Sequence, residues 1–208
     1  MRKFLVFIVM FALFTFGTFG QSSGPGVVQL RDVLNNGTVT LTASGNGDSS
    51  GFAVDGYLKN NTANKINISV IIQNGIYLKN SGRGQNMIAI QVFSSDGGYY
   101  SDGKNYFIIL PSQGTVDIVF NAYCADFDLD NPSAGESFSA VSIPAGIAGI
   151  ASKMSRYAAD NFDSDLDATI AMQLALWRIQ GNTRAEISKK FNFDNKDWDL
   201  STVIMNSL

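Results

Sequence analysis

The sequence predicts an α+β protein in which an N-terminal antiparallel β-sandwich packs against a C-terminal helical subdomain. Three observations predict this fold class. The chain has 208 residues, of which 45% are hydrophobic and 16% are charged, so it can bury a substantial core. Up to about residue 130, short β-prone runs alternate with clusters of Gly, Asn, Asp and Ser. From about residue 142, apolar residues recur at the three- and four-residue spacing that is typical of helices.

Residues 1–20 are predicted to be a secretory signal peptide that lies outside the fold. A positive start at Arg2 and Lys3 precedes an apolar run over residues 4–16, and small residues stand just before Gln21. The run is too short for a transmembrane helix. We therefore expect an exported protein, extracellular or at the cell surface, with no membrane insertion after the signal is cleaved.

The β-sandwich part is predicted over residues 21–135. Its expected strands are Thr38–Thr42, Phe52–Leu58, Ile66–Gln73, Met87–Phe93, Tyr106–Leu110 and Thr115–Cys124. Apolar residues alternate along the third and the sixth of these runs, so one face of each strand points inward. In the last run this alternation directs Phe120 and Cys124 toward the core and Asn121 away from it. Several strands at short intervals favour a sandwich.

The helical part is predicted over residues 136–208, and it forms one folding unit, residues 21–208, with the β part. Apolar residues at helical spacing begin at Ile147, and a second helix is expected over 165–180. A third helix begins at Thr183, where Thr183 and Glu186 have the spacing of a capping box. The tail over 198–208 is expected to hold a last short helix.

The composition excludes several classes of function. The chain has no histidine, which excludes Ser-His-Asp and Cys-His catalysis and any His-ligated zinc site. Its single cysteine excludes an internal disulfide framework. A net charge of −3 offers no electrostatic attraction to nucleic acid. Carboxylates for glycoside hydrolysis are present but follow no recognisable cleft pattern, so we do not expect an enzyme.

Cys124 and Gln173 are the most informative pair. An inward cysteine is usually a small hydrophobic core residue. Gln173 lies in a helix that is apolar on nearly all sides, and a buried amide without partners costs about 1–3 kcal/mol. A structural hydrogen bond would explain Gln173. So would a reaction in which the cysteine sulfur attacks the amide carbonyl and expels ammonia. The resulting intramolecular thioester would be opened by an amine to form an amide.

The motifs around this pair resemble the thioester domain of bacterial surface adhesins. Tyr123-Cys124 at a strand end matches the family's aromatic-Cys motif, and Gln173-x-Ala175-x-Trp177 matches its Thr-Gln-x-Ala-x-Trp motif, with a methionine in place of the threonine. The resemblance implies that Cys124 and Gln173 are cross-linked, that Trp177 shields the bond and that Ala175 lets the strand approach. It also implies covalent attachment to amines of surface or matrix proteins, with no cofactor.

Calcium is a weaker hypothesis. Asp126, Asp128 and Asp130 alternate as calcium ligands do, although the matching EF-hand frame fails, and a similar acidic group stands at residues 163–167. Solvated loops and helix N-caps explain these acidic residues equally well.

A rival function is a non-covalent β-sandwich binding or matrix module, with or without calcium, in which Cys124 is a structural core thiol. Tyr99, Tyr100 and Tyr106 would offer such a module a surface for stacking carbohydrate, although strand and turn aromatics explain them more simply.

Overall fold

The computed structural model describes residues 26–162 and 168–207. The expected signal peptide and the acidic group at 163–167 lie outside the described residues. Six strands close into an antiparallel barrel, in which each strand pairs with the next and the last pairs with the first. Around the barrel they are β10 (Ser137–Val141), β2 (Val39–Gly45), β3 (Ser50–Asn60), β9 (Thr115–Cys124), β6 (Met87–Ser94) and β5 (Ile71–Asn80).

The expected β-sandwich with a helical subdomain is therefore wrong. Strand β10 pairs with β2 through Phe138 and Ala43, and with β5 through Phe138 and Asn80, so it joins two edges that a sandwich would leave open. Alternating apolar residues show that one face of a strand is buried, but the same alternation occurs in sandwiches and in barrels, so it does not distinguish the two folds. The helices are not a separate subdomain either, because α2 (Ala145–Asp160) packs on barrel strand β5.

A second, four-stranded sheet lies beside the barrel in the order β1 (Val27–Val28), β4 (Ile66–Ser69), β8 (Tyr106–Leu110) and β7 (Tyr100–Ser101). The run expected as one strand over 66–73 divides between the two sheets at Val70. The Val70 N–H donates to the Tyr106 carbonyl and the Val70 carbonyl accepts from the Val92 N–H, both at 2.9 Å. One residue thus links β8 of the small sheet to β6 of the barrel.

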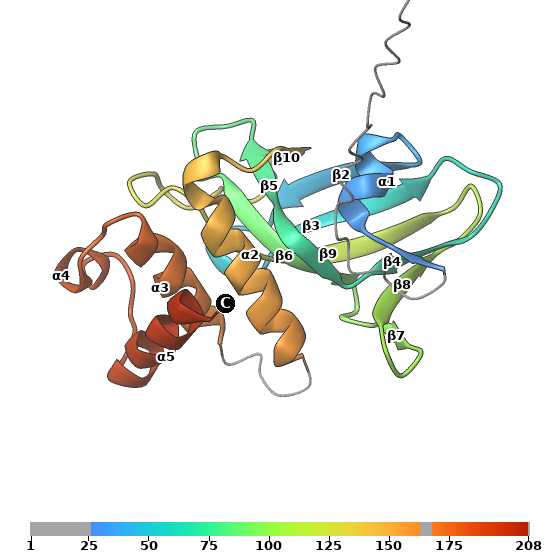
Figure 1. Cartoon of the computed structure of the whole chain (residues 1–208). Coiled ribbons are helices and arrows are strands. Elements are labelled where there is room, and N and C mark those ends of the chain that lie inside the picture. Colours follow the sequence, from blue (N-terminus) through green and yellow to red (C-terminus); the bar gives the residue numbers. More distant parts are fainter. Residues whose placement is uncertain (1–25, 163–167, 208) are drawn as a thin grey trace, which may run out of the picture.

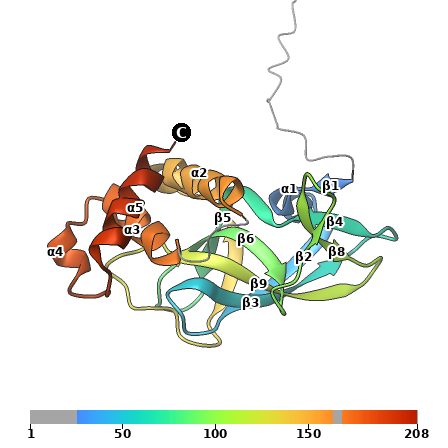
Figure 2. The ribbon, with the colours of Figure 1, turned by 90° about the horizontal axis from the view of Figure 1, so that it is seen from below.

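The helices gather at one end of the barrel. Helices α2, α3 (Thr169–Ile179), α4 (Arg184–Ile187) and α5 (Asn195–Asn206) lie there, while α1 (Leu30–Asn35) and the small sheet lie toward the other end (Figures 1 and 2). No described helix is both long and apolar enough to cross a membrane.

Two buried clusters form the core, and β9 separates them. One fills the barrel and includes Phe120 and Cys124. The other lies between the barrel wall and the helices and includes Tyr123 and Leu176. Strand β9 is buried on both faces from Ile118 to its end. Helix α3 packs on β9, and α2 packs on β5 and on β6, the strand next to β9.

Candidate functional site

Cys124 and Gln173 meet where the end of β9 touches α3. The Cys124 N–H donates to the Gln173 side-chain oxygen Oε1 at 2.8 Å. The Gln173 side-chain nitrogen Nε2 donates to the Cys124 carbonyl at 2.9 Å. Both residues are completely buried, with 0% of their surface exposed. The structure therefore brings these two residues together in a site without bulk water, and it satisfies the amide of Gln173.

The residues around Gln173 explain why α3 lies so close to β9. Leu174 and Trp177 join the cluster that fills the barrel, whereas Met172 and Ala175 join the cluster outside it. Because apolar side chains on both sides of α3 are buried, the helix packs closely on β9 and holds Gln173 against this strand. At the start of α3, Gly51 of β3 has a φ of +77°, and a Cβ there would lie 3.3 Å from the Thr169 methyl group. This glycine permits the close approach of helix and strand.

Cys124 carries a neutral thiol. Burial, and to a lesser extent the negative charge of Asp126, raises the pKa of this thiol from 9 to about 12. The Asp126 carboxylate accepts hydrogen bonds from the Asn86 N–H at 2.9 Å and from the Asn86 side chain at 2.6 Å. The cysteine is therefore in its thiol form, and its proton must be transferred when the sulfur attacks.

The three residues expected around the pair are all buried. Tyr123 and Ala175 belong to the cluster outside the barrel, and burial raises the pKa of the Tyr123 hydroxyl. Trp177 packs edge-on against Phe127 and Phe191, with ring centroids 5.3 and 5.4 Å away. Its Nε1 is buried without a hydrogen-bond partner among the described residues. Trp177 therefore sits in an apolar wall one helical turn after Gln173, which suits the shielding role expected of it.

The calcium candidates do not converge. Within residues 26–162 and 168–207, no three acidic or cysteine side chains lie close enough to hold a metal ion. Asp126 is occupied by Asn86, while Asp128 and Asp130 are exposed. These positions show no cation site.

The sequence interpretation missed several neighbours of the site. The Cys124 N–H also donates to the Ser49 carbonyl at 3.2 Å, so Ser49 and Gln173 share one donor. The Gln180 side chain donates to the Ala125 carbonyl at 2.7 Å, which adds a third side-chain hydrogen bond between the end of β9 and the α3 region. The available sequence signal was Gln180 itself, a polar residue two helical turns after the buried Gln173.

Comparisons of the chain with protein-family models, with curated proteins and with solved structures give no match. The residues of the site itself therefore carry the functional interpretation.

Proposed function

We propose that Cys124 and Gln173 form an internal thioester, and that the exported protein uses it to attach covalently to amines of surface or matrix proteins. The observation that carries the proposal is the pair of hydrogen bonds that places the Gln173 amide against the backbone of Cys124. Fixed proximity of this kind replaces the activation that a histidine would supply in an enzyme.

The same two hydrogen bonds suit bond formation. When the Cys124 Sγ attacks the Gln173 Cδ, negative charge develops on Oε1, which already accepts from the Cys124 N–H. The Cys124 carbonyl orients the Nε2 group that must leave. A C–S bond forms, the C–N bond breaks, and the thiol proton moves to the departing nitrogen, which leaves as ammonia.

In amine capture the sulfur, which was the nucleophile in thioester formation, becomes the leaving group. A primary amine attacks the thioester carbonyl, a C–N bond forms and the C–S bond breaks. The amine proton passes to the sulfur, so Cys124 becomes a thiol again. One bond is made per molecule and nothing turns over, which is attachment rather than enzymatic catalysis.

Complete burial of the pair controls access. Water is excluded, so the thioester resists hydrolysis, but an amine must also wait for α3 to loosen from β9. We expect slow uptake of methylamine by the native protein and faster uptake in urea concentrations below the unfolding transition.

Intact-mass measurement of the mature protein tests the proposal. The wild-type chain should be lighter than its sequence by one ammonia, and incubation with methylamine should add one methylamine. Cys124→Ser should show the full sequence mass and no uptake, because the hydroxyl is a much poorer nucleophile and preserves the shape of the site. Gln180→Ala is the matched control, because it removes a neighbouring, partly buried hydrogen bond and should keep the thioester.

A wild-type chain of full mass that takes up no methylamine would reject the thioester. The second candidate, a non-covalent binding or matrix module with Cys124 as a structural thiol, would then hold. One observation favours it: backbone hydrogen bonds already satisfy the Gln173 amide, which explains a buried glutamine without any reaction.

A further inference from the structure

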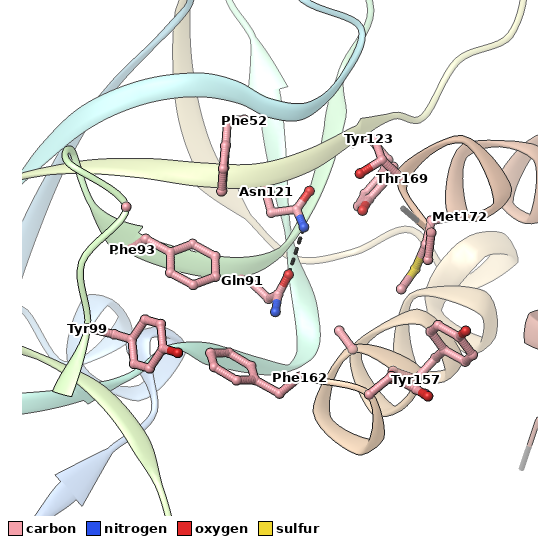
Figure 3. A pocket seen from close by; sticks show the side chains of 14 residues that line it. Phe52, Gln91, Phe93, Tyr99, Asn121, Tyr123, Tyr157, Phe162, Thr169 and Met172 are labelled. Atoms are coloured by element: carbon pink, nitrogen blue, oxygen red, sulfur yellow. Dashed lines mark hydrogen bonds between the residues drawn. The ribbon is translucent and has the colours of Figure 1, made fainter. Parts of the chain in front are cut away.

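A cavity of about 300 Å³ lies between the outer wall of the barrel and helices α2 and α3. It does not include Cys124 or Gln173. Most of its described lining residues are aromatic, apolar or amide side chains, with one hydroxyl from Thr169, and none of them carries a charge. At its centre the Asn121 side-chain nitrogen donates to the Gln91 side-chain oxygen at 2.7 Å (Figure 3).

Asn121 presents an unused acceptor to this cavity. The residue is 6% exposed, and its Oδ1 has no hydrogen-bond partner among the described residues. A buried acceptor without a partner destabilises the empty protein, so its retention points to a ligand that donates to it.

Two β-bulges direct side chains into the same cavity. Asn121 pairs with Phe52 of β3 on one side and with Gln91 of β6 on the other, and each register shifts by one residue directly beside that pair. Bulges re-aim side chains and are frequent next to functional sites. Here they bring Phe52, Asn121 and Gln91 into one row across three strands.

The aromatic side chains form a braced wall on one side of the amide pair. The Phe93 ring lies 5.6 Å from Phe52 and 6.2 Å from both Tyr99 and Phe162, between ring centroids. Phe52 and Tyr99 nonetheless remain 38% and 44% exposed. A rigid wall of aromatic rings that is still open to solvent is suited to stacking against a ligand.

We propose that this cavity binds a single pyranose sugar ring. Among the residues that the structure describes, the lining would leave a phosphate, carboxylate or ammonium group buried without a counter-charge. A pyranose is neutral, its C–H face packs against aromatic rings, and its hydroxyls donate to Asn121 and accept from amide nitrogens. The volume is at the small end for ligand pockets, which fits one ring. The cavity adjoins the proposed thioester, because Tyr123 and Met172 line it, but it contains neither Cys124 nor Gln173.

Amide-detected NMR of the isotope-labelled protein tests the proposal. The probes are the methyl glycosides of glucose, galactose and mannose, and N-acetylglucosamine. At least one should shift the side-chain amide signals of Asn121 and Gln91 in a saturable way. Tyr99→Ala should weaken that binding about tenfold, because it removes one stacking ring. Asn121→Leu should weaken it by a similar factor, because it removes the acceptor.

Tyr100→Ala is the matched control, since Tyr100 is 58% exposed, stacks on Phe107 and does not line the cavity. It should leave the affinity unchanged. Titration of Cys124→Ser should give the same result as wild type, which separates sugar binding from the thioester. The proposal is overturned if no probe shifts these amides, if Tyr99→Ala and Tyr100→Ala behave alike, or if only the apolar probe indole binds.

Discussion

Gln173 is the residue on which both candidate functions depend. Its amide closes a two-hydrogen-bond ring with the backbone of Cys124, in a place where no water is available to replace either bond. The geometry holds α3 against β9 if no reaction occurs, and it also positions the carbonyl carbon next to the cysteine. The contacts that lock α3 to β9 are therefore the same contacts on which the proposed thioester depends.

Cys124 makes the stability of the free-thiol protein depend on pH. The variant Gln173→Met fills a similar volume and cannot form a thioester, so its thiol titrates. The thiol pKa is 9 in an unfolded chain and about 12 in the fold. Below pH 9 both states are protonated and the thiol favours neither state. Between about pH 9 and 12 only the unfolded chain ionises, so stability falls by at most about 1.4 kcal/mol per pH unit.

Urea unfolding across this alkaline range measures the effect, with Gln173→Met/Cys124→Ser as the control. The control keeps the contribution of Tyr77, whose pKa burial also raises to about 12. The double variant should lose stability less steeply. Equal slopes for the two proteins would show that Cys124 is accessible to water in the native state.

At the scale of elements, α4 depends on Thr183, the residue that caps its N-terminus. The Thr183 hydroxyl accepts from the Glu186 N–H at 3.3 Å, and the Glu186 carboxylate accepts from the Thr183 N–H at 2.7 Å, which is the capping box expected from the sequence. A helix of four residues is too short to be stable in isolation, so its cap contributes a large share of its local stability. We expect Thr183→Ala to lower the free energy of unfolding by about 1 kcal/mol, measured by urea denaturation. Thr183→Ser keeps the hydroxyl and should cost much less, and similar losses in both variants would contradict a capping role.

Most elements were predictable because local signals determine them. The run Thr115–Cys124 matches β9 at both ends, and the end of α3 lies two residues before Gly181. The run over 66–73 was misjudged because its period of two continues unbroken across Val70, although the two halves pair in different sheets. The alternation of side chains along a strand does not indicate which neighbouring strand its backbone pairs with.

The candidate site was predictable in part. Alternation and the apolar surroundings of Gln173 place Cys124 and Gln173 in the interior, as the structure does. The sequence did not show that the Gln173 amide bonds the backbone of Cys124. Asn121 was expected to point away from the core, which would leave it in solvent. It is buried because α3 packs on that face of β9 and α2 packs on the neighbouring strand β6, and such coverage depends on tertiary packing alone.

At the scale of the whole molecule, β10 determines the architecture. Phe138 is buried in the barrel core and pairs with both β2 and β5. We expect Phe138→Ala to destabilise the protein by about 3–4 kcal/mol, because it leaves a cavity where the barrel closes. Thermal or urea unfolding measures this loss. Val141→Ala, on the same strand but 43% exposed, should change stability by no more than about 0.5 kcal/mol. Comparable losses would mean that closure does not depend on Phe138.

The position of β10 in the chain also sets an order of events during synthesis. Strands β2 and β5 are complete once residue 80 has been made, yet the segment that joins them ends only at residue 141. Until then both strands present unpaired backbone edges, which are the surfaces through which nascent chains associate wrongly. Nascent chains of 80 to 141 residues would therefore depend most on a chaperone that binds extended segments.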